Sequence, residues 1–168
     1  MNELQVLYGY IRLKKYDSLP LYLDKIRDKM LKESQLSKLG EPDLVLFLHS
    51  YRTLGGTMEL EVDPEEGLDL SHLKLHQSEL GAWITDVIKW FQTSTKPGED
   101  HFHQLNVELT LGNHELTVHY SFSGEIDEQQ LQSAMKRLVS EYESLGLRYS
   151  VTAQHEEADI AFDVPFHT

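Results

Sequence analysis

The stretch LNVELTLGNHELTVHYSF, residues 105–122, indicates the fold more clearly than any other part of the sequence. Apolar and polar residues alternate on both sides of Gly112-Asn113, which is the pattern of two strands that each bury one face. We predict a β-hairpin with these two turn residues as its loop. The register that follows pairs Leu109 with Leu116 and Asn106 with His119.

Helical periodicity is clear on both sides of this hairpin. Apolar residues recur at helical spacing over residues 80–91 and again over residues 131–145. The first of these helices carries Trp83 and Trp90 on the flank of its apolar stripe, a position typical of the boundary of a core. Two strands are predicted beyond the last helix, over residues 147–151 and 160–164.

The N-terminal part of the chain combines two helical segments with two strand-like segments. Residues 4–11 and 19–30 carry apolar stripes of helical spacing, and the chain is expected to break between them near Tyr16. Residues 44–51 are apolar at nearly every position, which favours a strand that is covered on both faces. Residues 57–62 alternate and predict a second strand with one face in water.

The elements follow one another as a helix and two strands, three times over, which gives the order αββαββαββ. We therefore predict an α+β fold with a largely antiparallel sheet of about six strands and helices packed on one face. No linker rich in Gly, Ser or Pro interrupts the 168 residues. The whole chain, residues 1–168, is expected to form a single domain.

Charge is the most informative bulk property. The chain has 15 basic and 28 acidic residues and a net charge of -13. Residues 1–40 hold eight Lys or Arg and five Asp or Glu, a net charge of +3, so the remaining residues carry -16. A field of this sign repels nucleic acid and anionic lipid and speeds the encounter with a basic partner. We expect neither a nucleic acid nor a membrane as partner.

The chain has no cysteine, which excludes a disulfide framework, a thiolate zinc site and a thiol nucleophile. A reducing compartment fits this composition. No apolar run approaches the roughly 18 residues that a membrane span needs. The expected location is the cytoplasm.

Residues that could support catalysis or metal binding are present without the spacing that either requires. The nine histidines include His101 and His103 on one side of a strand, but no third ligand converges on them. The run HEEAD, residues 155–159, has an Asp where a zinc-protease helix needs its second His. Nucleophile-elbow, phosphate-loop and dinucleotide fingerprints do not occur. We therefore expect no metal, no cofactor, no catalytic residues and no enzymatic activity.

An acidic run between residues 59 and 69 is the strongest candidate for a binding surface. It contains six carboxylates and no basic residue between its ends. It is either a solvated strand face that leads into a turn or a docking patch for a partner rich in Lys and Arg. The exposed face of the hairpin would extend this patch. The candidate partner-binding residues are Glu59, Glu61, Asp63, Glu65, Glu66, Asp69, Asn106, Glu108, Thr117 and His119.

The hairpin also carries a resemblance to a known family. A helix with aromatic residues, a short polar loop, LNVELTL at 105–111, Gly112 and ELTVHYSF at 115–122 together resemble the YezG-type immunity proteins. These are small acidic bacterial proteins that bind and neutralise a cognate toxin domain, often a nuclease. The tryptophan that tends to open the strand in that family is replaced here by His101-Phe102-His103.

Composition, missing catalytic motifs and this resemblance together lead to one functional prediction. We expect an immunity or antitoxin-like protein that neutralises a basic toxin, for example a nuclease, through its acidic surface. The alternative is a cytosolic adaptor or regulatory subunit that binds another protein and has no toxin partner. The oligomeric state does not follow from the sequence.

Overall fold

The computed structural model describes residues 2–54, 58–95 and 102–167, with the backbone alone for residues 52–54. Within these ranges the chain forms five α-helices, three short 3-10 helices and one five-stranded sheet. In chain order the elements are α1 (Glu3–Arg12), η1 (Tyr16–Ser18), α2 (Leu19–Ser37), α3 (Pro42–Leu54), β1 (Glu59–Pro64), η2 (Leu70–His72), α4 (Gln77–Ser94), β2 (Gln104–Leu111), β3 (Glu115–Ser123), α5 (Glu128–Glu141), η3 (Glu143–Leu145), β4 (Arg148–Gln154) and β5 (Glu157–Pro165).

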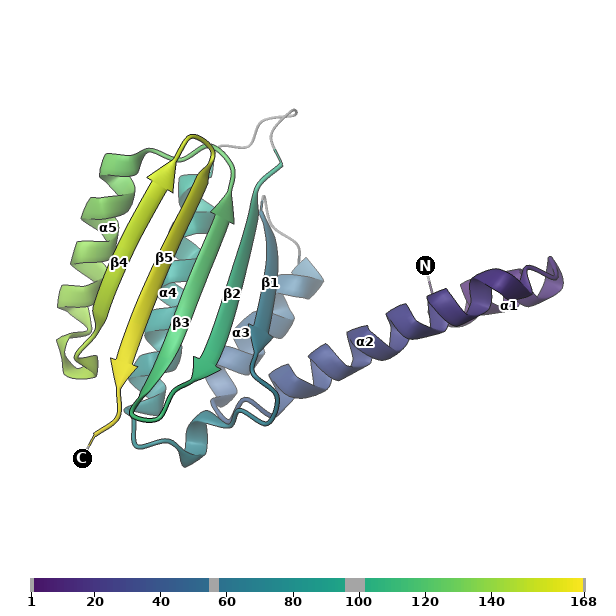
Figure 1. Cartoon of the computed structure of the whole chain (residues 1–168), viewed down its shortest axis with the longest axis horizontal. Coiled ribbons are helices and arrows are strands. Elements are labelled where there is room, and N and C mark those ends of the chain that lie inside the picture. The colour runs from purple at the N-terminus through teal and green to yellow at the C-terminus, as the bar shows by residue number, and fades with distance from the viewer. Residues whose placement is uncertain (1, 55–57, 96–101, 168) are drawn as a thin grey trace.

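The sheet is mixed, with the strand order β1-β2-β3-β5-β4. β1 runs parallel to β2, and the other three pairings are antiparallel. Helices α3, α4 and α5 lie together on one face of the sheet (Figure 1). The α+β class is thus confirmed. The predicted six strands and the order αββαββαββ are wrong, because residues 44–51 are helical and α4 makes a crossover between two parallel strands.

Residues 44–51 form most of α3 because their buried positions repeat at helical spacing. Leu44, Leu48 and Tyr51 are buried at positions i, i+4 and i+7 and pack into the core. Pro42 lies in the first turn, where proline is favoured. The buried carboxylate of Glu41 accepts a hydrogen bond from the Leu44 amide at 2.6 Å and so caps the helix. The predicted turn at Gly55-Gly56 lies outside the described residues.

The hairpin of β2 and β3 is confirmed, but its register differs from the prediction by two residues. Leu109 pairs with Val118, and Leu111 with Leu116. The turn is displaced by one residue along the chain, because the Gly112 amide donates to the Glu115 carbonyl oxygen at 2.8 Å and so encloses Asn113 and His114. Glu108 therefore lies opposite His119, the position that the prediction gave to Asn106.

The core is a layer of side chains between the sheet and the helices α3, α4 and α5. Trp83 is at its centre and is fully buried, whereas the sequence pattern placed it at the boundary. Its ring meets the rings of Tyr120 and Phe162 edge to face, with centroids 6.0 and 4.7 Å apart. The predicted helix over residues 131–145 is also confirmed, as α5 and η3, and Gly146 ends it in the left-handed conformation with φ 62°.

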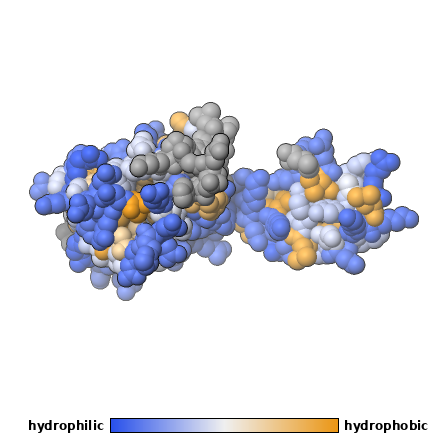
Figure 2. Space-filling model, turned by 90° about the horizontal axis from the view of Figure 1, so that it is seen from above, coloured by the Kyte–Doolittle hydropathy of each residue, from blue (hydrophilic) through white to orange (hydrophobic). Residues whose placement is uncertain are grey.

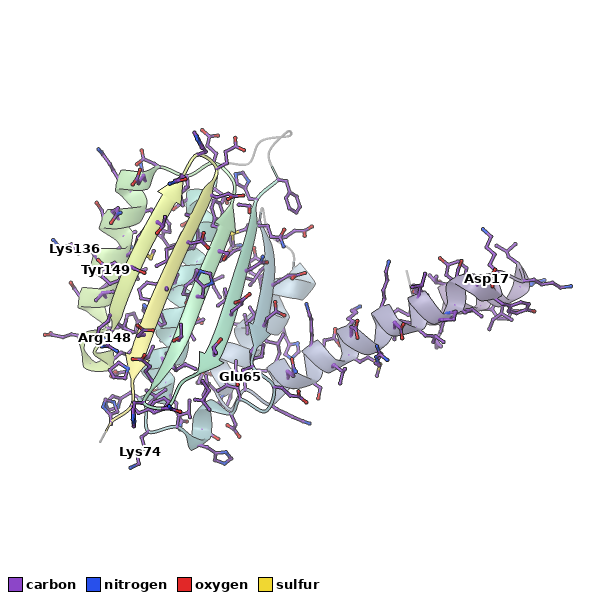
Figure 3. The ribbon with its side chains drawn as sticks, in the orientation of Figure 1. Asp17, Glu65, Lys74, Lys136, Arg148 and Tyr149 are labelled. Atoms are coloured by element: carbon purple, nitrogen blue, oxygen red, sulfur yellow. The ribbon has the colours of Figure 1, made fainter. Side chains whose placement is uncertain are left out.

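The first two helices project from this body as an arm (Figure 1). We call residues 2–37 the arm and residues 42–167 the body. Figure 3 shows Asp17 near the far tip of the arm and Lys136 at the opposite end of the molecule. α1 contributes no buried residue, and α2 contributes only Leu36. Within the described residues, every helix is too short or too polar to cross a bilayer.

Three tyrosines are expected to ionise late in an alkaline titration. Burial raises the pKa of Tyr51 and Tyr120, and burial together with its hydrogen bond to Asp86 raises that of Tyr142. The folded state holds these phenolic protons more tightly, so the stability they contribute is present below about pH 10 and lost as the pH rises further. Phenolate absorbance followed against pH, in native buffer and in urea, checks this. Coincident native and denatured curves would contradict it.

Candidate protein-docking site

The arm is a helical hairpin held together by few contacts. The side-chain oxygen of Asn2 accepts from the Leu4 amide at 3.0 Å and caps α1. The rings of Tyr10 and Tyr22 meet edge to face at 5.6 Å, and an ion pair joins the ammonium of Lys29 to the Glu3 carboxylate at 2.8 Å. These contacts align α1 antiparallel to the outer part of α2.

A crevice runs between the basal half of α2 and the neighbouring edge of the sheet. It has a volume of about 570 Å³ and is lined by Lys25, Asp28, Lys29, Lys32, Glu33 and Glu61. We call it the arm groove. The Lys32 ammonium lies 3.2 Å from an Asp63 carboxylate oxygen and 3.9 Å from a Glu61 one, and so ties the helix to β1. The groove therefore has walls from two distant parts of the sequence and carries charges of both signs.

A second crevice of about 520 Å³ lies at the base of α2, against the loop between β1 and η2. Gly40, with φ 84°, approaches Asp69 so closely that a Cβ atom would collide with its carboxylate. The Leu70 amide donates to the Leu39 carbonyl oxygen at 2.8 Å. These contacts fix the base of the arm to the body.

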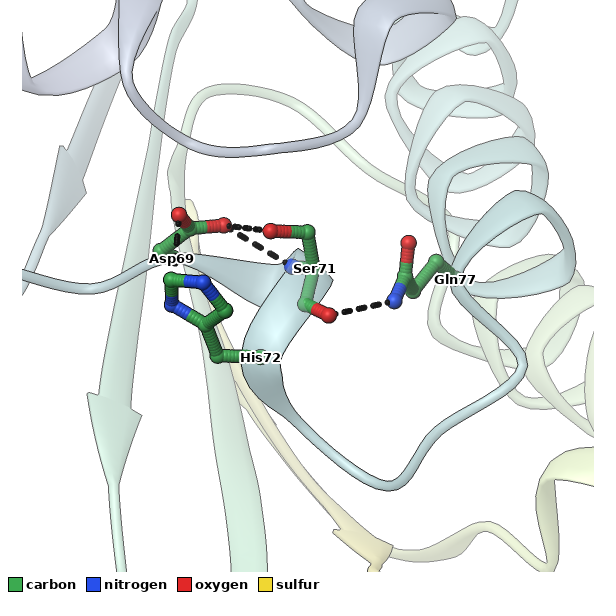
Figure 4. Close-up of polar contacts among 4 residues, drawn as sticks. All are labelled: Asp69, Ser71, His72 and Gln77. Carbon is green, nitrogen blue, oxygen red and sulfur yellow. Dashed lines mark hydrogen bonds and ion pairs between the residues drawn. The ribbon is translucent and has the colours of Figure 1, made fainter.

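The polar cluster in this loop contains Ser, His and Asp but has the geometry of a helix cap (Figure 4). One carboxylate oxygen of Asp69 accepts from the amide and the hydroxyl of Ser71, at 2.9 and 2.5 Å. His72 approaches the other oxygen at 3.5 Å and is 83% exposed. Since the hydroxyl is bonded to the carboxylate and not to the imidazole, the nucleophile and base of a hydrolase triad are not paired. The hydrogen bonds from Ser71 lower the pKa of Asp69.

The structure brings most of the predicted binding residues onto one face of the sheet. This face lies opposite the three helices, and among the described elements no helix covers it (Figure 1). Strand alternation and register place seven of the ten predicted residues here: Glu59, Glu61, Asp63, Asn106, Glu108, Thr117 and His119. Glu65, Glu66 and Asp69 lie apart from them, in the loop at the base of the arm.

Several of these residues already have partners within the protein. His119 lies 3.2 Å from a carboxylate oxygen of Asp159, and the Thr117 hydroxyl donates to Asp163 at 3.0 Å. The Glu65 carboxylate accepts from the Leu111 amide at 2.6 Å. Glu65 and Asp69 thus stabilise the loop, whereas Glu61 lines the arm groove. Their predicted role in partner binding stays a prediction.

Sequence reasoning missed the other wall of the arm groove. Lys25, Lys29 and Lys32 lie off the apolar stripe of their helix and are exposed to solvent, so the pattern of the sequence did not single them out as a binding surface. Their spacing of four and three residues places them on one side of α2, which is the signal that could have identified this wall. Within the described ranges, no group of three or more His, Asp or Glu side chains is arranged to hold a metal ion.

No family model matches the chain, and no curated protein matches it either. Solved structures do match. The blue-light activated histidine kinase of Erythrobacter litoralis EL346 superposes with a TM-score of 0.57 at 14% identity, over 75% of this chain and 41% of that one. The catalytic domain of the histidine kinase ThkA matches with a TM-score of 0.54 at 12% identity, over 80% of this chain and 92% of that one.

A larger structure of ThkA, in complex with the response regulator protein TrrA, matches almost the whole chain. The TM-score is 0.51 at 13% identity, over 99% of this chain and 58% of that one. The chain thus spans about half the length of these larger kinases, 41% of one and 58% of the other. At such identities the matches establish a shared fold.

These matches correct three predictions. The prediction of a toxin-neutralising immunity protein is wrong, because the fold is that of histidine kinase catalytic domains. The alternative of an adaptor or regulatory subunit gains no support from them. The expectation that the chain is not an enzyme is contradicted as well, since the domains that share its fold are catalytic. The resemblance of the hairpin to YezG-type proteins is not tested by any match and stays a prediction.

Proposed function

We propose that the chain is a histidine-kinase-like unit of a two-component signalling pathway and that its arm groove docks a response-regulator type of protein. One observation carries the proposal. The catalytic domain of ThkA alone matches 80% of the chain, whereas the larger ThkA structure matches 99%. The part of this chain that only the larger ThkA structure matches is close in size to the arm. This supports a similarity that includes the arm as well as the body.

The same comparison supports the class of partner that we propose. The larger ThkA structure was solved with a response regulator bound, which supports a partner of that class for this chain. The arm groove suits such a role because it is lined by charged residues of both signs, which come from α2 and from β1. Polar grooves with paired charges favour specific, reversible association.

Histidine kinases use ATP, and proteins bind its phosphates with Lys, Arg and backbone amides. The crevice of about 330 Å³ between the end of α4 and the start of α5 does not fit a polyphosphate. Its lining among the described residues contains the carboxylates of Glu125 and Asp127 and no Lys or Arg. No step through ATP is therefore proposed, and the proposal rests on the docking of the partner protein.

The direct test is titration of this protein with the purified receiver domains of response regulators from the same genome, followed by calorimetry. We expect at least one receiver domain to bind with a dissociation constant on the order of micromolar, because transient signalling interfaces are small. An acidic protein of similar size that is not a receiver serves as control and should not bind. If no receiver domain binds at concentrations of about 100 µM, where a constant of that size gives near saturation, the proposal is wrong.

A further inference from the structure

The far end of the arm presents cations and apolar side chains together. Residues 12–18 connect α1 to α2 there, and we call them the arm tip. Figure 2 shows apolar patches among hydrophilic residues over the projecting arm. Leu13 and Tyr16 are 68 and 58% exposed, although both side chains are large and mainly apolar. They alternate along the sequence with three exposed cations, which are Arg12, Lys14 and Lys15.

Backbone hydrogen bonds hold the arm tip in a defined turn. The Lys15 amide donates to the Tyr10 carbonyl oxygen at 2.9 Å, and the Lys14 amide donates to that of Ile11 at 3.1 Å. This pair of bonds ends a helix in the motif that usually has glycine in the left-handed conformation. Here that residue is Lys14, with φ 54°. A lysine is less stable than glycine in this conformation, which favours a role for its charge.

The charge of the arm tip is not neutralised within the arm. Closer to the body, the ammonium groups of Lys29 and Lys32 pair with carboxylates. Within the described ranges, Lys14 and Lys15 have no carboxylate partner of this kind. From residue 4 to residue 23 the sequence contains a single acidic residue, Asp17. The arm tip therefore attracts anions.

The acidic body does not cancel this attraction. Residues 41–168 carry a net charge of -16, and residues 1–40 carry +3. α2 has 19 residues and is about 28 Å long, whereas the Debye length is about 8 Å at physiological salt. The field of the body is thus screened at the arm tip. The net charge of the whole chain predicted no membrane partner, but that value averages two regions of opposite sign.

The apolar side chains indicate which kind of anion the arm tip meets. Besides Leu13, Leu21 in the first turn of α2 is 69% exposed. A nucleic acid offers phosphates and bases, and an aliphatic side chain gains little from either. An anionic bilayer offers phosphates together with apolar acyl chains directly beneath them. Tyrosine is also enriched at this boundary, because its ring is apolar and its hydroxyl is polar.

We propose that the arm tip binds the surface of an anionic membrane. Leu13 and Tyr16 enter the headgroup region, where their apolar surface leaves water. The three cations of the arm tip lie beside the lipid phosphates. The arm keeps the acidic body away from the membrane by the length of α2, about 28 Å, so the negative charges of body and lipid do not oppose the contact.

The few groups in the arm tip set the strength of binding. Each cation near an anionic surface strengthens binding about fivefold, so three of them give roughly a hundredfold. Burial of one leucine and one tyrosine side chain adds roughly another hundredfold. We expect a partition constant on the order of 10⁴ M⁻¹, which is comparable to that of a single myristoyl chain and fully reversible.

Flotation with lipid vesicles tests the proposal. The wild type should float with vesicles of phosphatidylcholine and about 30% phosphatidylserine, and at least tenfold less with phosphatidylcholine alone. The variant Lys14→Gly, Lys15→Gln should bind the anionic vesicles at least tenfold more weakly, and glycine retains the turn. Lys136→Gln, Arg137→Gln on α5 is the matched control, because it has the same net charge and alters the opposite end of the molecule. It should bind like the wild type.

Quenching by brominated lipids gives the position of the contact. Tyr16→Trp places a new indole in the arm tip, and Tyr149→Trp places one on β4 of the body (Figure 3). Brominated lipid in the anionic vesicles should quench the emission of the former variant and leave that of the latter unchanged.

Three results overturn the proposal: no flotation with anionic vesicles, equal losses in the two charge variants, or tighter binding of a DNA duplex than of the vesicles. Because no receiver domain is present, each result leaves the proposed docking in the arm groove to its own test.

Discussion

Replacement of Trp83 by alanine is expected to lower the free energy of unfolding by about 3–5 kcal/mol. The indole is fully buried on α4 and contacts the rings of Tyr120 and Phe162 on the sheet. Its removal leaves a cavity where the helix layer meets the sheet, and neighbouring side chains fill such a cavity only in part. Typical domains have only about 5–15 kcal/mol of total stability, so the variant should be close to unfolding.

Urea unfolding followed by circular dichroism measures this loss. Trp90→Ala is the matched control, because Trp90 is on the same helix and is only half-buried. We expect Trp90→Ala to lower the free energy of unfolding by about 1–2 kcal/mol, because a half-buried indole has gained only part of its transfer free energy on folding. Equal losses in the two variants would show that α4 does not pack against the sheet through Trp83.

Inversion of the charges on the two walls of the arm groove is expected to weaken the binding of the receiver domain at least tenfold. The variant Lys25→Glu, Glu61→Lys keeps the net charge of the chain and changes only the local field of the groove. Charges arranged to complement a partner repel it when their signs are exchanged. The expected loss of at least tenfold corresponds to about 1.4 kcal/mol or more of binding free energy.

Calorimetry at two ionic strengths separates this effect from loss of structure. Lys136→Glu, Glu141→Lys on α5 is the control, because it exchanges the same two charges far from the arm (Figure 3). This control should bind like the wild type. Unchanged binding by the groove variant, with unchanged salt dependence, would exclude the groove as the docking site.

The part of the fold that the sequence predicts well is the part with one-sided burial. β2, β3, α4 and α5 each have one buried side and one solvated side, so the period of their apolar residues identifies them. Residues 44–51 were misread because their solvated positions are apolar too: Leu46 is 66% exposed. Glu41 and Pro42 begin that helix, and their presence before the apolar run indicates a helix start.

The pairing of strands could be predicted only where a short loop joins them. β1 alternates clearly, but alternation says nothing about which strand lies beside it. Its parallel partner β2 follows only after the whole of α4, and contacts made across such a distance leave no local pattern. The sheet was predicted to be largely antiparallel, and β1 with β2 is the one parallel pairing among the four that the structure describes.

The candidate site was predicted in part. The alternation of apolar and polar residues placed Glu61 on the solvated side of its strand, and the structure places it in the arm groove. The lysines of the opposite wall come from a helix whose apolar stripe looked like an ordinary core face. An amphipathic pattern is the same whether the cover is the body of the chain or another molecule, so the projection of the arm could not be foreseen.

Amide hydrogen exchange with and without a receiver domain tests the docking proposal most directly. The expected result is slower exchange in residues 25–33 of α2 and in β1, whose residues form the two walls of the groove, with no change in α5 or β4. The measurement reports binding and its position at once. Exchange that is unaltered in the groove at saturating receiver domain, or protection confined to α5 and β4, would contradict the account.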